Sequence, residues 1–290
     1  MNKVLVIVGP TASGKTALAI DKANELDGEI INYDSIQVYK DIPTLTAYPT
    51  HKELSSALHK LFGYLNYNDN ISVVDWANLA AIEIQKTWSK GKLPILVGGT
   101  GLYIDILING ISPLPSIPDE IRNKATLLAS NNFAKLCNDV YKFDPNIKNI
   151  IKPENHHQMM RSWEIQMTSN KSILYFYSLP KQKFINAIFK FINTNIDRQV
   201  LYDRINKRFD MMIQNGVVDE VEELMKKFNT NDYENLFKNY HIFKAIGAKE
   251  IVRYLNNEIN YNTMMELSKQ YSRNYAKRQI TWFKYHCNNK

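Results

Sequence analysis

The sequence predicts an α/β fold in which a parallel sheet is flanked by helices and carries an inserted helical subdomain. Three observations support this class. Short apolar runs rich in β-branched residues alternate with segments of helical periodicity. Two of these runs end in glycine-rich turns, and a polar stretch without strand patterns interrupts the alternation near the middle of the chain. Such alternation is typical of a parallel sheet that helices cover on both faces.

In the first half of the chain, strand and helix patterns follow one another. KVLVIV, which ends at Gly9-Pro10, predicts a central strand, and KTALAIDKANEL has the apolar spacing of a helix. GEIINY predicts a second strand. VVDWANLAAIEIQKTWSKGK predicts a helix that starts near Asp75 and ends at Gly91. LPILVGGTGLYIDILING then repeats the order of strand, glycine turn and helix, so another parallel strand is expected.

The alternation stops after SPLPSIPDEIR, where three prolines interrupt the chain. The following pattern is helical and polar, and it is broken at Asp144-Pro145 and Lys152-Pro153. It predicts an inserted helical subdomain over 113–169, between two parts of a core at 1–112 and 170–290. SILYFYSLP predicts a strand that returns to the sheet. Four later segments predict helices: NIDRQVLYDRINKRFDMMIQNG, VVDEVEELMKKF, NYHIFKAIGAKEIVRYL and YNTMMELSKQYSRNYAKRQITWFKYH.

Composition argues against several classes of protein. The 290 residues are 44% hydrophobic, enough for a packed core, and no segment approaches the roughly 20 apolar residues of a membrane span. Cys137 and Cys287 have no nearby ligand cluster, so neither a disulfide scaffold nor a zinc site is expected. We therefore expect a cytoplasmic protein with no membrane association. The net charge of +7 favours a polyanionic partner without identifying one.

The first glycine turn matches the phosphate-binding pattern G-x-x-x-x-G-K-[ST] in full, between a predicted strand and a predicted helix. Backbone amides and the helix N-terminus bind phosphate in such a loop, while the lysine adds a charge and the hydroxyl can hold magnesium. The fold class is therefore P-loop NTPase-like, although the identity of the phosphate compound stays open. The loop consists of Gly9, Pro10, Thr11, Ala12, Ser13, Gly14, Lys15 and Thr16.

Asp34 follows the second predicted strand, at the edge where open α/β sheets bind ligands. The residue alone leaves three interpretations open: a turn cap, a magnesium ligand as in kinases, or a base. Its neighbours Ser35, Gln37 and Tyr39 favour recognition of a ring with hydrogen-bonding edges.

A second glycine turn, VGGTGLY, places Thr100 among three glycines at the same edge of the predicted sheet. Alone it is equally compatible with a structural turn. Together, the two turns predict a shared cleft or channel.

Basic residues form two sets on predicted helices, with Tyr275 and Trp282 interleaved in the second set. Such stripes are commonly a solvated helix face, but they also suit a nucleic-acid backbone. The adjacent pair His156-His157 lacks further ligands, so a metal site is not expected there. The first set contains Arg198, Arg204, Lys207 and Arg208; the second contains Arg273, Lys277 and Arg278.

Six motifs in order, GPTASGKT, DSIQVY, VGGTGLY, SPLPS, AIGAKE and YAKRQITWF, resemble the bacterial tRNA dimethylallyltransferases, also called tRNA isopentenyltransferases. The resemblance runs from the first strand almost to the C-terminus. It implies transfer of a dimethylallyl group from dimethylallyl diphosphate to the exocyclic amine of the adenosine 3′-adjacent to the anticodon. It also implies a Mg²⁺ cofactor, the tRNA anticodon stem-loop as partner, and a monomer. The residues themselves leave one alternative open, an ATP-dependent small-molecule kinase.

The resemblance assigns roles to individual positions. Asp34 would be the general base, with Lys15, Thr16 and Lys244 as further catalytic residues; Thr16 would hold the metal, and Gly9 to Thr16 would bind diphosphate. Two departures stand out: Lys244 replaces a family arginine, and the loop DIPTLTAYPT is longer than the family's turn and has no lysine. The residues expected to contact tRNA are Asp34, Ser35, Ile36, Gln37, Thr100, Arg122, Gln158, Met159, Met160, Arg161, Ser162, Arg273, Lys277 and Arg278.

Overall fold

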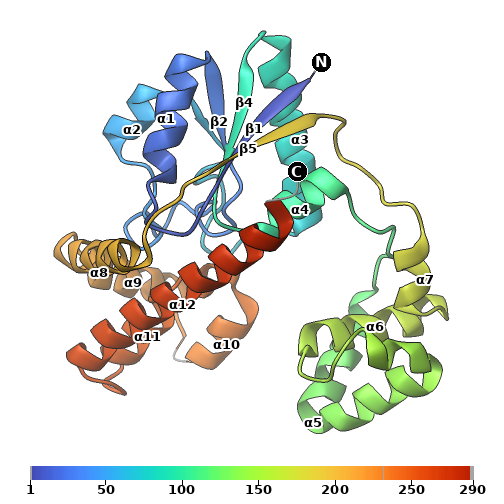
Figure 1. Cartoon of the computed structure of the whole chain (residues 1–290). Helices are drawn as coiled ribbons and strands as arrows, with labels where there is room; N and C mark the ends of the chain where they lie inside the picture. Colours follow the sequence, from blue (N-terminus) through green and yellow to red (C-terminus); the bar gives the residue numbers. More distant parts are fainter. Residues whose placement is uncertain (1, 231, 288–290) are drawn as a thin grey trace. The chain divides into compact units, whose positions relative to one another are not determined.

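Five parallel strands form the sheet at the centre of the fold, in the order β3-β2-β4-β1-β5 (Figure 1). The computed structural model describes residues 2–230 and 232–287. Because every neighbouring pair is parallel, all carboxyl ends meet at one edge of the sheet. The predicted α/β class is thereby confirmed. The strands are β1 (Lys3–Val8), β2 (Gly28–Asn32), β3 (His59–Lys60), β4 (Leu93–Val97) and β5 (Ile188–Asn193).

Helices cover both faces of this sheet, which agrees with the nearly continuous burial of β1, β2 and β4. Ala19 and Ala23 of α1 (Lys15–Glu25) pack against Ile7 and Ile30 on one face. On the other face lies α3 (Val73–Ser89), whose fully buried Trp76 donates its indole N–H to the Asn32 carbonyl oxygen at 3.1 Å (Figure 1). The first half is completed by α2 (His51–Ser56) and α4 (Gly101–Asn109).

The chain divides into two compact units. The larger unit combines Met1–Ile108 with Phe184–Lys290, and its second part adds helices around a core that includes Phe209, Val221 and Phe243. These elements are α8 (Arg198–Gln214), α9 (Val217–Phe228), α10 (Tyr233–Asn239), η2 (His241–Lys244), α11 (Ala248–Leu255) and α12 (Tyr261–Cys287).

The smaller unit, Asn109–Lys183, is helical and has a core of its own around Leu136 and Trp163. Ile111 and Gln182 exchange backbone hydrogen bonds of 3.0 and 2.9 Å, which hold the two ends of the unit together. Its elements are α5 (Asp119–Phe143), η1 (Pro145–Asn149), α6 (His156–Ser169) and α7 (Ile173–Ser178).

The strand predicted from SILYFYSLP is wrong, because Ile173–Ser178 forms the helix α7. Ser172 caps this helix by accepting a hydrogen bond from the Leu174 amide at 3.2 Å, and Ile173 is buried in the core of the smaller unit. Alternating aromatic residues imitated a strand, whereas the fifth strand is Ile188–Asn193.

The helix predicted over NYHIFKAIGAKEIVRYL is interrupted. Gly247, with φ of +97°, separates η2 from α11. Positive φ favours glycine and is incompatible with a continuous right-handed helix, so the chain turns there. Among the residues described, no helix is both long and apolar enough to span a bilayer.

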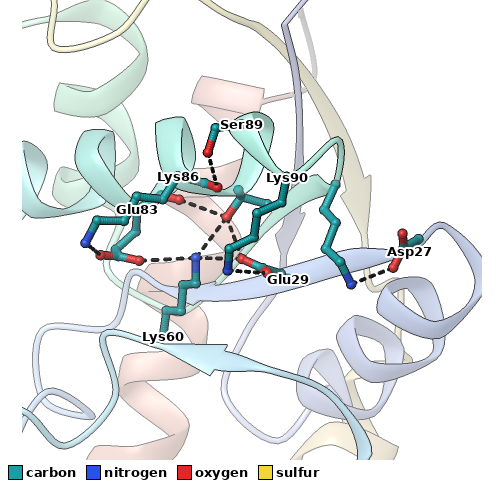
Figure 2. A network of polar contacts seen from close by, with 9 residues as sticks. Asp27, Glu29, Lys60, Glu83, Lys86, Ser89 and Lys90 are labelled. Carbon is teal, nitrogen blue, oxygen red and sulfur yellow. Dashed lines mark hydrogen bonds and ion pairs between the residues drawn. The ribbon is translucent and has the colours of Figure 1, made fainter.

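A buried ion network lies beside the amino end of β2, away from the carboxyl edge of the sheet (Figure 2). The Glu29 carboxylate, only 2% exposed, pairs with Lys60 at 2.6 Å and Lys90 at 3.0 Å, and accepts a hydrogen bond from Thr87 at 2.9 Å. Burial opposes ionisation, but these donors outweigh it and lower the pKa of Glu29 to about 2. The network therefore joins β2, β3 and α3 through a charge that stays ionised.

Candidate active site

The phosphate-binding loop connects β1 to α1 at the carboxyl edge of the sheet. Gly9 is required by space, because a Cβ there would lie 1.9 Å from the Thr194 hydroxyl oxygen at the end of β5. Gly14 is required by conformation, with φ of +91°. The Ser13 and Thr194 hydroxyls are 2.6 Å apart and hydrogen-bonded. The loop is thus fixed against the end of the edge strand before any ligand binds.

The loop presents positive charge and free donors to a cavity of about 630 Å³. The amides of Gly14, Lys15 and Thr16 have no acceptor among the described residues, as is usual for the start of a helix. The Lys15 ammonium donates to the Pro10 carbonyl oxygen at 2.7 Å. Burial lowers the pKa of Lys15 to about 7, with Asp34 acting to raise it and Arg208 to lower it further. An anion would satisfy all of these groups.

Asp34 is held rigidly just beyond β2. Its amide donates to the fully buried Asn32 side chain at 2.8 Å, and its Oδ1 accepts from the amides of Ile36 at 3.0 Å and Gln37 at 3.4 Å. Its Oδ2 accepts no hydrogen bond from the described residues. One carboxylate oxygen therefore orients the side chain, and the other is available to receive a proton.

The second glycine turn is built against Asp34 and α12. A Cβ on Gly99 would come within 3.0 Å of Asp34 Oδ2, and one on Gly101 within 2.4 Å of the Trp282 ring. Thr100 accepts a hydrogen bond from the Ser35 amide at 2.9 Å and lies 3.2 Å from the Ser35 hydroxyl. The second glycine turn is therefore in direct contact with the segment that carries Asp34 and Ser35.

Gln279 of α12, only 4% exposed, bridges the two glycine turns. Its side-chain oxygen accepts from the Thr11 amide at 2.7 Å, and its nitrogen donates to the Gly99 carbonyl oxygen at 2.9 Å. The Tyr275 hydroxyl also donates to Gly99, at 3.3 Å. The Thr11 amide, expected to bind diphosphate, is therefore already engaged within the protein.

Asp34 lies in the wall between two cavities. The second cavity, of about 380 Å³, shares with the phosphate-loop cavity the lining residues Thr11, Asp34, Thr46, Ala47, Arg208, Met212 and Tyr275. It is also lined by Ser35, Ile36, Thr100, Lys244 and Arg278. Seven of the predicted site residues, Thr11 and Asp34 among them, therefore meet around this second cavity. Lys244 is exposed and lines only the second cavity, not the one at the phosphate loop.

A loop that follows β2, residues 41–50, forms another wall of both cavities. The Gln37 side chain donates to the carbonyl oxygens of Thr46 at 3.0 Å and Ala47 at 2.9 Å. From α9, the Glu220 carboxylate accepts from the amides of Thr44 at 2.7 Å and Leu45 at 2.9 Å. Both donor hydrogens of the Gln37 amide thus hold the loop.

The predicted basic stripes separate into inward and outward residues. Arg208 lines both cavities and donates to the Thr11 hydroxyl at 3.2 Å. Arg273 is half-buried and donates to the Asn206 side chain at 2.7 Å, whereas Lys277 and Arg278 are exposed. Sequence reasoning missed the role of Arg208 in the cavity. A signal was present, because Arg208 lies on the same helix face as the buried Leu201 and Ile205.

In the smaller unit, the predicted contact residues differ in accessibility. Arg122 and Gln158 are exposed, and Met160 is half-buried. Arg161 is half-buried and pairs with Glu164 at 3.2 Å. Met159 and Ser162 are buried, the first in the core of the unit and the second with its hydroxyl donating to the Gln158 carbonyl oxygen at 2.8 Å.

The described residues contain no group of three or more histidine, cysteine, aspartate and glutamate side chains that could hold a metal ion. Thr16 and Asp34 both line the phosphate-loop cavity, so a metal there would take most of its ligands from phosphate and water. Cys137 is buried and free, and the side chain of Cys287 lies outside the described residues.

Comparisons with known proteins agree on one family. The model of a family described as IPP transferase matches residues 37–286. A tRNA dimethylallyltransferase of Rickettsia bellii is 38% identical over 290 residues, which cover 99% of this chain and 90% of the relative. The full-length tRNA isopentenylpyrophosphate transferase of Bacillus halodurans superposes with a TM-score of 0.68 at 32% identity, covering 99% and 88% of the two chains. A eukaryotic dimethylallyltransferase acting on tRNA superposes with a TM-score of 0.82 at 26% identity. This match covers 98% of the present chain and 70% of the eukaryotic one.

Proposed function

The chain belongs to the IPP transferase family, and from this membership we propose that it transfers a dimethylallyl group from dimethylallyl diphosphate to tRNA. The acceptor is the exocyclic amine of the adenosine 3′-adjacent to the anticodon, and diphosphate is released. One observation carries the proposal: Asp34 lies between a phosphate-loop cavity and a second cavity, where it can meet donor and acceptor together.

The donor's diphosphate binds at the phosphate loop. The amides of Gly14, Lys15 and Thr16 and the Lys15 ammonium point donors at its oxygens. The Thr16 hydroxyl would hold Mg²⁺, which supplies charge neutralisation for the leaving group when bound. These donors are fixed in advance, so they stabilise the negative charge that grows on the diphosphate as it departs.

The acceptor adenine occupies the second cavity, beside Ser35 and Thr100. Because the base is stacked within the anticodon loop, it must flip out to enter. The amine forms a bond to the allylic carbon while the carbon–oxygen bond to diphosphate breaks, and that electron pair goes to the diphosphate oxygen. The amine becomes acidic as it bonds, and Asp34 Oδ2 accepts its proton.

The tRNA backbone is held by basic and polar side chains. In the larger unit these are Lys277 and Arg278, which are exposed on α12, with Arg278 also lining the second cavity. In the smaller unit they are Arg122, Gln158 and Arg161, while the buried Met159 and Ser162 support α6. Contacts of this type add affinity that falls as salt concentration rises.

A small-molecule kinase would use the same phosphate loop, but the relatives named above are transferases that act on tRNA. The deciding experiment incubates the protein with unmodified tRNA, dimethylallyl diphosphate and Mg²⁺ without ATP. Mass spectrometry of the nucleosides should reveal an added dimethylallyl group on the adenosine next to the anticodon. An absolute requirement for ATP, or unmodified adenosine with a phosphorylated small molecule, would reject the proposal.

A further inference from the structure

We infer that Asn32 is a positioning residue for the reaction, because its side-chain amide fixes the backbone on both sides of Asp34 and so aims the carboxylate. This inference rests on the proposed function, since it treats Asp34 as the general base. Asn32 is the last residue of β2, is fully buried and does not line either cavity. It can therefore influence the reaction only through the residues that it holds.

The Asn32 amide holds both peptide groups that flank the Cα of Asp34. Its Oδ1 accepts from the Asp34 amide at 2.8 Å, and its Nδ2 donates to the Asp34 carbonyl oxygen at 3.1 Å. The direction of a Cα–Cβ bond follows from these two peptide planes, since φ and ψ are the only soft dihedrals of the backbone. Fixing both planes therefore fixes the point from which the Asp34 side chain extends.

The far end of the Asp34 side chain is held separately, by the turn that follows. Its Oδ1 accepts from the amides of Ile36 and Gln37, which restricts rotation of the carboxylate. Its Oδ2 lies so close to the second glycine turn that a Cβ on Gly99 would be 3.0 Å away. Loss of the Asn32 amide would thus displace Oδ2 without removing any group that meets a substrate.

A third hydrogen bond of Asn32 connects Asp34 to the loop that follows β3. Nδ2 also donates to the Leu61 carbonyl oxygen, at 2.9 Å. Leu61 has φ of +60°, a left-handed conformation that a leucine adopts at a steric cost, and such strain persists where the surroundings impose it. The preceding residue, Lys60, fastens β3 to β2 through its ion pair with Glu29 at 2.6 Å. The loop is therefore a fixed support for Asn32.

These contacts explain why asparagine occupies position 32. An acceptor for the amide two residues further on is common in turns, and serine or aspartate can supply it. Only an amide side chain adds two donor hydrogens to that acceptor, and here both hydrogens are used, on the carbonyl oxygens of Asp34 and Leu61. The side chain is thus fully hydrogen-bonded around the residue that accepts the proton.

The experiment compares Asn32→Leu and Asn32→Ser with the wild-type protein, using dimethylallyl diphosphate, Mg²⁺ and unmodified tRNA. In Asn32→Leu kcat should fall roughly 10- to 100-fold, because misplacing a catalytic group by 1 Å costs up to a hundredfold. Serine still accepts from the Asp34 amide, so Asn32→Ser should have an intermediate kcat. Both KM values should stay within about twofold of wild type, because Asn32 contacts neither substrate. Wild-type kcat in either variant would overturn the inference.

Thr87→Val is the matched control for lost stability. It removes a buried hydroxyl that donates to Glu29 and Glu83, beside the amino end of β2 and away from Asp34. We expect this variant to be less stable than the wild type while keeping its kcat. A fall in kcat as large as that of Asn32→Leu would show that general destabilisation is the cause, and the inference would be wrong.

A double-mutant cycle with Asp34→Asn separates positioning from support of the fold. If Asn32 acts through the Asp34 carboxylate, adding Asn32→Leu to Asp34→Asn should lower kcat by no more than about twofold, because the group that it positions is already absent. A second loss as large as that of the single variant would contradict the positioning role.

Amide hydrogen exchange tests the inference without relying on prenylation. The Asp34 amide should exchange faster in Asn32→Leu than in the wild type, while the amides of α3 keep their wild-type protection. Unchanged exchange at Asp34 would reject the inference. If the wild-type protein does not prenylate tRNA but the Asp34 amide is released in Asn32→Leu, the proposed function fails and the hold of Asn32 on Asp34 stands.

Discussion

Gln279 accepts a hydrogen bond of 2.7 Å from the Thr11 amide, although the two residues are 268 positions apart in the chain. The same side chain donates to Gly99 at 2.9 Å. One buried amide group thus sets the distance between the phosphate loop and the second glycine turn. Because Asp34 packs against Gly99, the position of the base relative to the phosphate loop depends on this bridge.

Replacing Gln279 with leucine should misplace the two turns. The Thr11 amide would lose its acceptor inside the protein, at a cost of about 1–3 kcal/mol, and the Gly99 carbonyl oxygen would keep only the Tyr275 hydroxyl at 3.3 Å. Denaturant unfolding should report the lost stability, and steady-state kinetics should report a lower kcat. Gln199→Leu removes an exposed glutamine of α8 and is the matched control. Wild-type kinetics in the Gln279 variant would contradict the positioning role.

Asp34→Asn should remove the general base while preserving the conformation of the turn at residues 34–37. The asparagine oxygen can still accept from Ile36 and Gln37, so the local backbone should stay in place. We expect turnover to fall by roughly 10²- to 10⁴-fold, the range for loss of a general base, with tRNA affinity near that of wild type. Single-turnover kinetics and a tRNA binding assay measure the two effects. An equal loss in both would assign Asp34 to recognition instead.

Glu220→Ala should release the loop at residues 41–50. The amides of Thr44 and Leu45 lose their acceptor, and this loop lines both cavities. The expected result is a KM for dimethylallyl diphosphate raised about tenfold, with a smaller change in kcat, because a mobile wall must be ordered when substrate binds. Glu223→Ala, two-thirds exposed on the same helix, provides the control. Equal kinetics for the two variants would show that the loop needs no such anchor.

The Glu29 network should make stability depend on pH in the acid range. The pKa of Glu29 is about 2 in the folded protein and 4.5 as its ordinary value, so the unfolded chain binds the proton more readily. The stabilisation is complete above pH 4.5 and is lost as pH falls towards 2, by up to about 3 kcal/mol. Chemical denaturation at several pH values should show that the free energy of unfolding falls less steeply with decreasing pH in Glu29→Gln than in the wild-type protein. Glu266→Gln, which changes an exposed glutamate, is the control variant. Identical slopes of unfolding free energy against pH for the wild type and Glu29→Gln would refute the prediction.

Features encoded within short stretches of sequence could be predicted. The phosphate loop was identified because Gly9 and Gly14 stand where space and backbone conformation demand glycine. The position of Asp34 followed from its place at the end of a strand, since parallel strands bring their carboxyl ends to one edge. The helices α1 and α3 followed from apolar spacing and end signals.

Features that depend on distant contacts could not be predicted. The edge strand Ile188–Asn193 contains lysine and asparagine because one side of it faces solvent, so its pattern was weak. Ile173–Ser178 has the alternation of a strand, but a serine cap and burial of its first residue make it a helix. Arg208 was grouped with surface cations because the basic residues were identified by charge, without asking which side of the helix each one occupies. The partners of Gln279 could not be predicted because no residue near it in the sequence indicates them.

The pairing of β1 with β5 has a consequence for how the protein is made. Lys3 lies opposite Ile188 in the sheet, so after its synthesis β1 waits for a partner that is translated roughly 10–40 s later. Throughout that interval one side of β1 has unpaired backbone amides and carbonyls. The apolar side chains of Val4, Val6 and Ile7, which are buried in the folded protein, lie on the same strand. Such an open edge can join other nascent chains. Correct synthesis therefore calls for the unfinished sheet to be shielded, and slow translation between the two strands should increase aggregation.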